Sequence, residues 1–336
     1  MKAMTIGFLV ASAIGASANA QDVKLRYTEW LPPTYFANEN GLYPYFEDIA
    51  RVTEGRVVVE KSAAPLGPPP RNYQLVLDGI ADMAWGLHGY TPGTFPLSEM
   101  VELPFYSTNA EANSVAYWKV FEEYLEPAGM HPGVVTLTVH TQPPGQIFNK
   151  LRPIKAPGDF TGLKIRSTNA GVAASLQALG ATPIGLPVTE MRDALEKGIV
   201  DGVSLTDEAL FNFRIEDFVK YETIVPGGLY NASMFLVVNP ATWARISPED
   251  QAAIMEISGE ALARRLGRMW QDEQDAGFEL AKNAGIEMSE ASGALLDHIR
   301  GKLAFQEAAW IEKAAAAGLD AEAVLSAYRE ASGAVE

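Results

Sequence analysis

The sequence of 336 residues contains no cysteine, and it has fewer basic than acidic residues. Without thiols the chain cannot form disulfides, thiolate zinc sites or a cysteine nucleophile. Its 26 Lys and Arg residues against 42 Asp and Glu residues give a formal net charge of −16. This charge repels nucleic-acid phosphates and anionic lipid surfaces. We therefore expect no nucleic-acid partner, and an anionic ligand would need a local basic residue.

Common catalytic motifs are also absent from the sequence. It contains no GxSxG, HExxH, P-loop or GxGxxG motif. The positions of the four histidines show no metal-ligand spacing: His88, His131, His140 and His298. We therefore assign no metal and no cofactor, and we predict that the protein is not an enzyme. A secreted hydrolase is the alternative, which turnover of an ester or a glycoside would favour.

A long run of small and apolar residues occurs at the N-terminus, where Lys2 precedes "MTIGFLVASAIGASANA". Ala18 and Ala20 have the small-x-small spacing that signal peptidases recognise. The pattern predicts a signal peptide over residues 1–20, cleaved after Ala20, and an exported protein. No other stretch of the sequence reaches the roughly 18 uncharged apolar residues of a membrane span, so we expect the mature protein to be soluble.

Short β-rich runs alternate with helical stretches after residue 21. We expect strands at residues 23–27, 57–60, 83–85, 134–139, 146–148, 163–165, 182–184 and 200–203. This alternation predicts an α/β architecture with mostly parallel sheets. The chain is also long enough for two cores, since single cores stop growing at roughly 250 to 300 residues.

The pattern changes at residue 231. The apolar run 231–239 predicts a strand that crosses between two lobes. Ser247, followed by Pro248 and Asp250, has the signature of a helix N-terminus. Helical spacing then continues through a set of residues that predicts one long helix from Ser247 with a buried stripe: Ile254, Ile257, Ala261, Leu262, Leu266 and Met269.

Five segments occur in a characteristic order: "LVLDGIADMAWG", "ELPFYS", "GLKIRS", "ALEKGIVDGVS" and "FLVVNPATWARISPEDQAAI". In this order and spacing the sequence resembles the solute-binding subunits of TRAP transporters, over residues 23–325. These subunits are periplasmic receptors of ion-driven uptake systems. The resemblance implies a two-lobe periplasmic-binding-protein-like fold with crossing hinge strands, a long lobe-spanning helix and a ligand cleft that closes. It also implies integral membrane subunits as partners and a periplasmic location.

The resemblance and the sequence pattern together predict the division of the chain. Lobe I is expected to contain residues 21–142 and 231–270. Lobe II is expected to contain residues 143–230 and 271–305. The remaining residues, 306–336, are expected to form C-terminal helices.

Arg166 is the central candidate for ligand binding. The resemblance implies that an arginine directly after "GLKI" binds the carboxylate of the ligand, and Arg166 occupies that position. A guanidinium group is planar and matches a carboxylate with two parallel hydrogen bonds, which lysine cannot do. Without the resemblance, an arginine at the end of a strand is about as well explained by a structural ion pair.

Gln146 stands where several acid-binding members of this family carry a second arginine. Its neutral amide departs from that pattern. The departure favours a monocarboxylate with an uncharged body over a dicarboxylate or a sialic-acid-like ligand. The alternative is a glutamine that faces solvent on a strand.

Other pocket residues are expected in loops that follow strands, because such loops face the cleft in folds of this kind. The candidates are Trp85, His88 and Tyr90 after one strand, Trp30 and Tyr35 after the first strand, Ser204, Thr206 and Phe211 in the second lobe, and Tyr230, Asn231 and Met234 at the crossing strands. Core packing is the alternative for Trp85 and Met234, and an exposed loop position is the alternative for His88. Asp207 and Glu208 are expected to cap the next helix.

These inferences predict a periplasmic solute receptor that delivers a small organic monocarboxylate to the membrane subunits of a transporter. The pocket candidates include several aromatic residues, so we expect the ligand to have an aromatic or apolar body. Two alternatives are a zwitterionic solute and a receptor of an ATP-driven importer. Neighbouring genes for two integral membrane subunits, rather than for an ATPase, would distinguish the last alternative.

Overall fold

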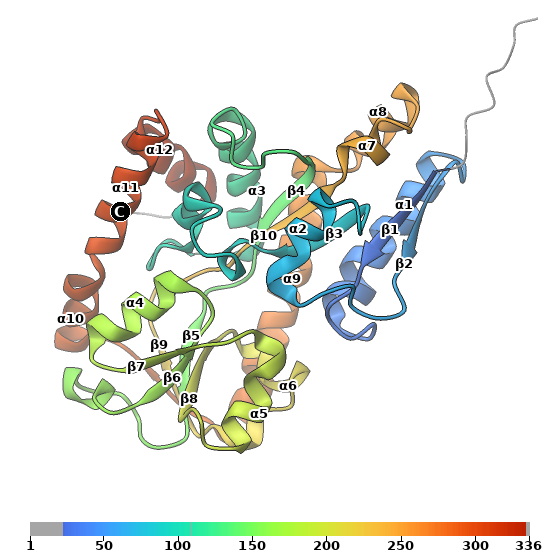
Figure 1. The fold of residues 1–336 in the computed structure, drawn as a ribbon. Helices are drawn as coiled ribbons and strands as arrows, with labels where there is room; N and C mark the ends of the chain where they lie inside the picture. Colours follow the sequence, from blue (N-terminus) through green and yellow to red (C-terminus); the bar gives the residue numbers. More distant parts are fainter. Residues whose placement is uncertain (1–22, 108, 334–336) are drawn as a thin grey trace, which may run out of the picture.

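The computed structural model describes residues 23–107 and 109–333 of the chain. The predicted signal peptide, residues 1–20, lies outside the described residues. The described chain forms two lobes, each built around one β-sheet with helices on its faces (Figure 1). This is the α/β, two-lobe architecture that the sequence predicts.

The sheet of lobe I has five strands in the order β2-β1-β3-β10-β4. These strands are β1 (Val23–Thr28), β2 (Val57–Lys61), β3 (Met83–Leu87), β4 (Val135–Thr141) and β10 (Ser233–Val238). β1 is parallel to both β2 and β3, whereas β10 is antiparallel to β3 and β4. The antiparallel strand β10 enters the sheet from the other lobe, so the predicted mostly parallel pairing holds for only part of the sheet.

The sheet of lobe II has six strands in the order β11-β9-β5-β8-β6-β7. These strands are β5 (Gln146–Asn149), β6 (Lys164–Ser167), β7 (Thr182–Gly185), β8 (Gly202–Leu205), β9 (Tyr221–Ile224) and β11 (Glu287–Glu290). β6 is parallel to β7 and β8, and β5 is antiparallel to β8 and β9. The sequence pattern does not predict β9 and β11, because acidic residues interrupt the apolar pattern in both of these short strands.

Helices surround the two sheets. The α-helices are α1 (Tyr43–Val52), α2 (Asn72–Leu77), α3 (Ala110–Val120), α4 (Ala170–Leu179), α5 (Met191–Glu196), α6 (Asp207–Asn212), α7 (Pro240–Trp243), α8 (Pro248–Glu256), α9 (Gly259–Asn283), α10 (Gly293–Leu303), α11 (Phe305–Ala316) and α12 (Ala321–Ser332). Shorter helical turns are η1 (Ala37–Leu42), η2 (Pro69–Arg71), η3 (His88–Tyr90), η4 (Pro96–Glu102), η5 (Phe121–Leu125), η6 (Pro157–Phe160), η7 (Val188–Glu190) and η8 (Glu216–Phe218).

Two chain segments cross between the lobes and form the hinge. β4 leads into β5, and β9 leads into β10, and the two segments are joined midway by an antiparallel bridge between Gly145 and Tyr230. A Cβ atom at Gly145 would lie 1.9 Å from the ring of Tyr230. Only glycine allows the two crossing segments to approach this closely.

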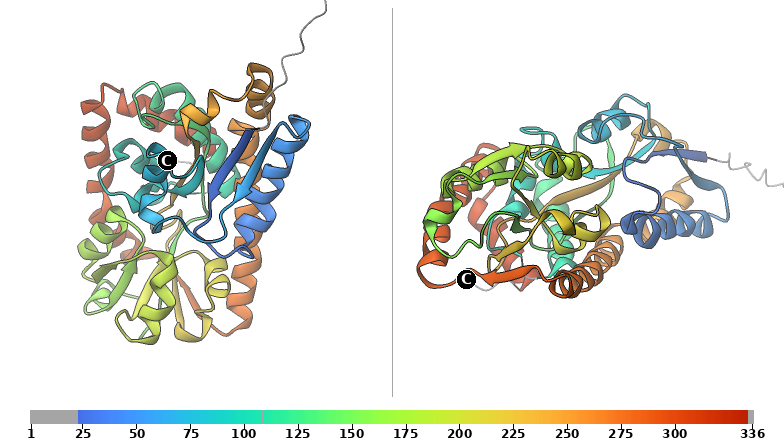
Figure 2. Two further views of the ribbon diagram at one scale, coloured as in Figure 1. Left: turned by 45° about the vertical axis from the view of Figure 1, so that its right-hand side comes forward. Right: turned by 90° about the horizontal axis from the view of Figure 1, so that it is seen from below.

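The long helix α9 runs along both lobes (Figure 2). It packs against α3 of lobe I and α6 of lobe II. Two glycines permit these contacts: a Cβ atom at Gly267 would lie 2.6 Å from the Ala110 carbonyl oxygen, and one at Gly277 would lie 2.4 Å from the Glu208 nitrogen. The lobe-spanning helix predicted from the sequence is therefore present.

The start of this helix differs from the prediction. Ser247 caps α8 as expected, since its side chain accepts a hydrogen bond from the Asp250 nitrogen, but the helix ends at Glu256. Ser258 then donates its hydroxyl to the Ile254 carbonyl, at 2.6 Å, and Gly259 adopts a φ of +55°. These two residues break the helix, and Ala261 lies on the exposed side of α9.

The last helices attach to both lobes. α10 packs against α4 of lobe II, whereas α11 packs against η4 and α12 against α3, both in lobe I. The Trp310 indole nitrogen anchors α11 by donating to the Leu97 carbonyl at 3.1 Å. α11 and α12 therefore extend the surface of lobe I, whereas α10 extends that of lobe II.

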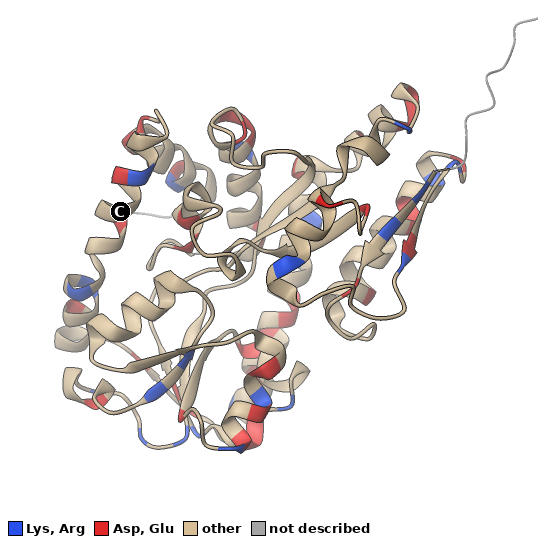
Figure 3. Cartoon of the chain, viewed as in Figure 1, with Lys and Arg blue, Asp and Glu red and all other residues tan. Residues whose placement is uncertain are grey.

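Acidic and basic residues are interspersed along the ribbon of both lobes in the view of Figure 3. Among the described residues, no helix combines the length and the apolar character needed to cross a membrane.

Candidate functional site

A cavity lies between the two lobes, lined by residues from both sheets, the hinge and α9. Its empty space, including the part open to solvent, is about 420 Å³.

The guanidinium group of Arg166 forms part of the cavity wall. Arg166 lies at the end of β6 and is only 1% exposed. Its Nε donates to the Leu186 carbonyl at 3.0 Å, and its Nη1 donates to the Thr168 hydroxyl at 2.8 Å and to the Ser204 carbonyl at 3.3 Å. These hydrogen bonds hold the group in one orientation.

The remaining nitrogen of Arg166, Nη2, is buried and has no hydrogen-bond partner among the described residues. No described carboxylate forms an ion pair with Arg166 either, although the structure has ion pairs elsewhere, such as Arg56 with Asp250. A buried cation without a counter-charge is unfavourable by several kcal/mol. The site is therefore suited to an anionic group that occupies the cavity and pairs with this nitrogen.

Lobe I forms an aromatic wall opposite this charge. The Trp30 and Trp85 rings are stacked with centroids 5.4 Å apart, and Tyr90 meets Trp30 edge-on at 6.0 Å. The Trp30 indole nitrogen donates to the Trp85 carbonyl at 3.0 Å, and the Trp85 indole nitrogen donates to His140 Nε2 at 2.9 Å. Because their polar atoms are already paired, both indoles can present apolar surface to a ligand.

Burial lowers the pKa of His140 to about 3. The ring is therefore neutral at physiological pH, and its Nε2 can accept the hydrogen bond from Trp85. His140 thus fixes the orientation of the aromatic wall from behind.

Contacts between the lobes show that the cavity is in a closed conformation. The Val188 nitrogen of lobe II donates to the Tyr90 hydroxyl of lobe I at 3.1 Å. The Asn169 amide of lobe II donates to the Glu102 carboxyl of lobe I at 2.8 Å. Burial raises the pKa of Glu102 to about 8.

Glu208 also lines the cavity, near the start of α6. Its side chain is 2% exposed, and its Oε1 accepts a hydrogen bond from the Thr206 hydroxyl at 2.6 Å. Its Oε2 is buried without a hydrogen-bond partner. Glu208 was expected to cap α6. Instead, Thr206 is the N-cap residue, and the Glu208 side chain faces the interior between the lobes.

Eight of the candidate residues from the sequence line this cavity: Trp30, Tyr35, Trp85, Tyr90, Arg166, Thr206, Tyr230 and Met234. They come from loops and strand ends of both lobes and from the hinge. The topology thus brings together residues that are up to 204 positions apart in the chain, from Trp30 to Met234.

Gln146 is not among the residues that line the cavity. Its side-chain oxygen accepts a hydrogen bond from the Val225 nitrogen at 2.7 Å, and the side chain is 6% exposed. It therefore continues the pairing between β5 and β9 beyond the end of β9. The Gln146 side chain therefore does not face solvent, as one reading of the sequence suggested, and it lies outside the cavity lining.

His88 is buried in lobe I beside the cavity rather than exposed on a loop. Its Nδ1 shares a hydrogen bond with the Ser233 hydroxyl at 2.6 Å, and its Nε2 shares one with His131 Nε2 at 2.7 Å. Burial holds the pKa of His88 well below its ordinary value. His88 thus belongs to a neutral hydrogen-bonded group beneath the wall.

The other three candidates support neighbouring groups instead of lining the cavity. Ser204 donates its hydroxyl to the Arg166 carbonyl at 3.0 Å, and its own carbonyl accepts from Arg166. The Asn231 side chain accepts from the Ala232 nitrogen at 2.8 Å. Phe211 is partly buried against the core of lobe II.

The rest of the lining consists of residues that were not candidates from the sequence: Leu31, Leu87, Gln142, Thr168, Val188, Leu205, Glu208, Ala209, Phe213 and Trp270. Thr168 had a usable signal, since it follows Arg166 by two residues at the same strand end. Trp270 had none, because it is one of several apolar residues on a long helix.

No group of three or more His, Asp and Glu side chains in residues 23–107 and 109–333 is arranged to hold a metal ion.

The chain is similar to known solute-binding proteins in both sequence and structure. The family model of the bacterial extracellular solute-binding proteins, family 7, matches residues 38–305. The structure is also similar to that of a TRAP periplasmic solute-binding protein from Bordetella bronchiseptica with bound (R)- and (S)-mandelate. The two are 34% identical with a TM-score of 0.90, and the match covers 93% of this chain and 99% of that chain.

Two further solved structures resemble it at a TM-score of 0.85, and each match covers 93% of this chain and 98% of the other. One is a marine metagenome TRAP solute-binding protein specific for aromatic acid ligands, in complex with metahydroxyphenylacetate and 30% identical. The other is a TRAP solute-binding protein from Rhodoferax ferrireducens in complex with copurified benzoate, 28% identical.

Proposed function

Because this chain belongs to family 7 of the bacterial extracellular solute-binding proteins, the receptors of TRAP transporters, we propose that it is a periplasmic receptor for a small aromatic monocarboxylate. In this proposal the carboxylate of the ligand binds Arg166, and its ring lies against the aromatic wall of lobe I. The loaded receptor then delivers the ligand to the integral membrane subunits of the transporter. Family membership also argues against the alternative that the chain is a receptor of an ATP-driven importer.

The observation that carries the proposal is the unpaired Nη2 of Arg166 in the wall of a closed, largely apolar cavity. Arg166 is the one basic residue among those that line the cavity, so it supplies one anchor for one acid group. The solved relatives bound to mandelate, metahydroxyphenylacetate and benzoate support an aromatic acid as the ligand class.

The same geometry explains how binding would drive closure. In the closed state without a ligand, the Arg166 guanidinium is desolvated and unpaired, which is unfavourable. A ligand carboxylate that pairs with Arg166 would remove this unfavourable contribution from the closed state, in which both lobes surround the ligand. Since a ligand shifts a conformational equilibrium only through its differential affinity for the two states, the acid group would select the closed conformation.

A ligand screen by thermal unfolding tests the proposal. The ligand-free protein is mixed with aromatic monocarboxylates, C4-dicarboxylates, sugar acids and zwitterionic betaines. A ligand at 100 times its dissociation constant stabilises the folded protein by about 2.7 kcal/mol, so the aromatic acids should raise the melting temperature. Benzyl alcohol, which has the ring without the acid, is the matched ligand control and should have no effect.

Stabilisation by C4-dicarboxylates or sugar acids alone would refute the aromatic ligand class. Stabilisation by betaines would favour the zwitterionic alternative, in which a cationic group lies between the aromatic wall and an ionised Glu208. Burial raises the pKa of Glu208 to about 8, so this carboxyl is mainly neutral at pH 7, which favours the uncharged ligand body.

A further inference from the structure

Three buried polar atoms of cavity-lining residues have no hydrogen-bond partner among the described residues. They are Arg166 Nη2, Glu208 Oε2 and Trp270 Nε1. The ligand carboxylate would pair with the first. Buried polar groups in folded proteins are nearly always hydrogen-bonded, so the other two atoms indicate that the ligand carries a second polar group.

Glu208 is held firmly at the same edge of the lobe II sheet as Arg166. Arg166 is the second-last residue of β6, and Glu208 follows the end of the adjacent parallel strand β8. The close approach of Gly277 on α9 fixes the backbone of Glu208, and the Thr206 hydroxyl orients its carboxyl group. The free oxygen Oε2 is therefore a rigid, positioned group and not a mobile surface charge.

Trp270 borders the cavity from α9, the helix that packs against α6. It precedes Gly277 by seven residues, which is about two helical turns. The two residues therefore lie on the same face of α9, the face turned towards α6 and Glu208. The indole N–H of Trp270 is a donor only, so it needs an acceptor.

The charge state of Glu208 limits which ligand group suits it. Burial raises the pKa of Glu208 to about 8; the hydrogen bond from Thr206 acts in the opposite direction, and the neighbouring Asp207 and Glu273 add to the rise. A neutral carboxyl group both donates and accepts hydrogen bonds. A hydroxyl group has the same two capacities, whereas a ligand ammonium group offers no acceptor to Trp270.

We propose that Glu208 is a specificity-determining residue that hydrogen-bonds a hydroxyl group on the body of the ligand. The receptor then distinguishes hydroxylated aromatic monocarboxylates from the same acids without the hydroxyl. This inference rests on the proposed function, because it takes Arg166 to bind the carboxylate. A site built to bind a hydroxyl discriminates strongly against its absence, since the protein group is otherwise left buried and unpaired.

Calorimetric titration of matched ligand pairs tests the inference on protein that has been unfolded and refolded to remove bound solute. The pairs are mandelate with phenylacetate, 3-hydroxyphenylacetate with phenylacetate, and 3- or 4-hydroxybenzoate with benzoate. For at least one pair we expect the native protein to bind the hydroxylated acid roughly tenfold or more tightly.

Variants of Glu208 test whether this residue causes the preference for the hydroxylated acid. Glu208→Gln should keep the preference, because the amide also donates and accepts. Glu208→Met should remove it: affinity for the hydroxylated acid falls roughly tenfold or more, while affinity for the unsubstituted acid stays within about threefold. Should Glu208→Met fail to fold, Glu208→Ala replaces it in the same titrations.

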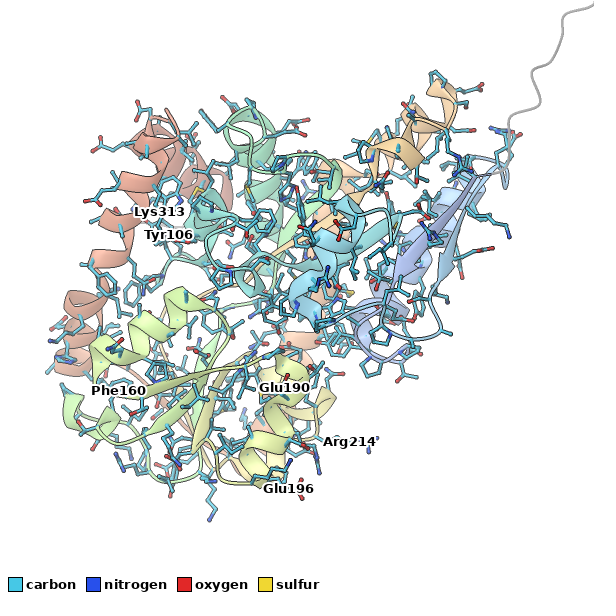
Figure 4. All side chains as sticks on the ribbon, viewed as in Figure 1. Tyr106, Phe160, Glu190, Glu196, Arg214 and Lys313 are labelled. Atoms are coloured by element: carbon cyan, nitrogen blue, oxygen red, sulfur yellow. The ribbon has the colours of Figure 1, made fainter. Side chains whose placement is uncertain are left out.

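A matched control is Glu196→Gln, which alters an exposed carboxyl group on α5 at the outer surface of lobe II (Figure 4). It should leave both affinities of each pair unchanged. Equal binding of all pairs by the native protein, or equal losses for both members in Glu208→Met, would overturn the role of Glu208 and leave the proposed function intact. Absence of binding to every aromatic acid would overturn both proposals.

Discussion

The two lobes contribute different chemistry to one cavity. Lobe I presents the stacked rings of Trp30 and Trp85 with Tyr90 at their edge, whereas both charged or chargeable groups of the lining, Arg166 and Glu208, come from lobe II. The polar atoms of these three rings are paired within the protein. The polar groups of lobe II retain unpaired atoms.

This division means that a ligand must satisfy two different surfaces for the lobes to close on it. An acid without a ring would pair with lobe II but leave the wall of lobe I without apolar contact. A ring without an acid would leave Arg166 buried and unpaired. Changes in the two lobes should therefore alter selectivity in different ways.

The largest effect is expected from Arg166. Arg166→Lys removes Nη2, the nitrogen that is free to pair with the ligand. The loss of its charge-assisted hydrogen bond, about 1.5 to 3 kcal/mol, corresponds to a loss of roughly 10- to 100-fold in affinity. The loss should be similar for aromatic and aliphatic monocarboxylates, because the variant changes only the acid anchor. Titration calorimetry measures it, with circular dichroism as the check on folding. Unchanged affinity in a folded variant would return Arg166 to a structural role.

A smaller and more selective effect is expected from Trp30 in lobe I. Trp30→Ala removes ring contact and apolar surface from the wall, and we expect affinity for aromatic acids to fall roughly 10- to 30-fold. An aliphatic acid such as propionate, which cannot cover the wall, should lose less than threefold. Equal losses for the two ligand classes would contradict the assignment of the ligand body to lobe I.

A variant of Asn169 tests whether the hydrogen bond between Asn169 and Glu102 holds the two lobes closed. Asn169→Ser should keep the cap of α4, since serine also caps helices, but its side chain is too short to replace the interlobe hydrogen bond to Glu102. We expect ligand affinity to fall about 3- to 10-fold through faster dissociation, as measured by stopped-flow fluorescence.

Asn109→Ser is the matched control for this variant, because Asn109 caps α3 within lobe I. It should likewise keep the cap, and it should leave the dissociation rate unchanged. Equal effects of the two substitutions on dissociation would indicate that the interlobe bond does not hold the closed state.

Lobe I buries histidines that titrate, and both lobes bury carboxyl groups that titrate. Lobe I buries His131 and His140, whose pKa values burial lowers to about 3, so protons favour the unfolded chain and stability rises with pH between about 3 and 6.5. Burial raises the pKa of Glu102 in lobe I and that of Glu208 in lobe II to about 8. At each carboxyl group the folded protein then holds a proton that the unfolded chain releases near pH 4.5, and stability falls as pH rises from 4.5 to 8.

Between pH 4.5 and 6.5 the two sets oppose each other, and above pH 6.5 only the carboxyl contribution changes. We therefore expect the free energy of unfolding of the ligand-free protein to fall between pH 6.5 and 8. The decrease is at most about 1.4 kcal/mol per pH unit for each carboxyl group. Urea unfolding measures it, and Glu208→Gln should make the dependence shallower. A rise in stability over this range would contradict the raised pKa.

The sequence was most informative where the signal is local. Arg166 follows a short apolar strand in the motif "GLKIRS", and a side chain at the end of a parallel strand must emerge at one edge of the sheet. The end of the third strand likewise indicated Trp85, and the segments after the first and third strands indicated Trp30 and Tyr90. Local strand and turn patterns suffice for such positions.

The structure differs from the sequence-based expectations where distant segments decide the outcome. One long helix from Ser247 has correct periodicity, but the hydrogen bonds of Ser258 and the left-handed Gly259 divide it. Gln146 was expected to bind the ligand, which stays a prediction, and its side chain accepts a hydrogen bond from the Val225 nitrogen just after β9, at 2.7 Å. Glu208 has the spacing of a cap, but the close packing of α9 at Gly277 buries it.

The sequence by itself therefore determined the family, the two α/β lobes and the arginine at the strand end, because motif order, hydrophobic periodicity and turn residues are properties of neighbouring positions. Only the tertiary structure decided which side chains border the cavity and which of their polar atoms remain unpaired. The reason is physical: burial, and with it the pKa of Glu208 and the free nitrogen of Arg166, depends on lobes, hinge and α9 packing together.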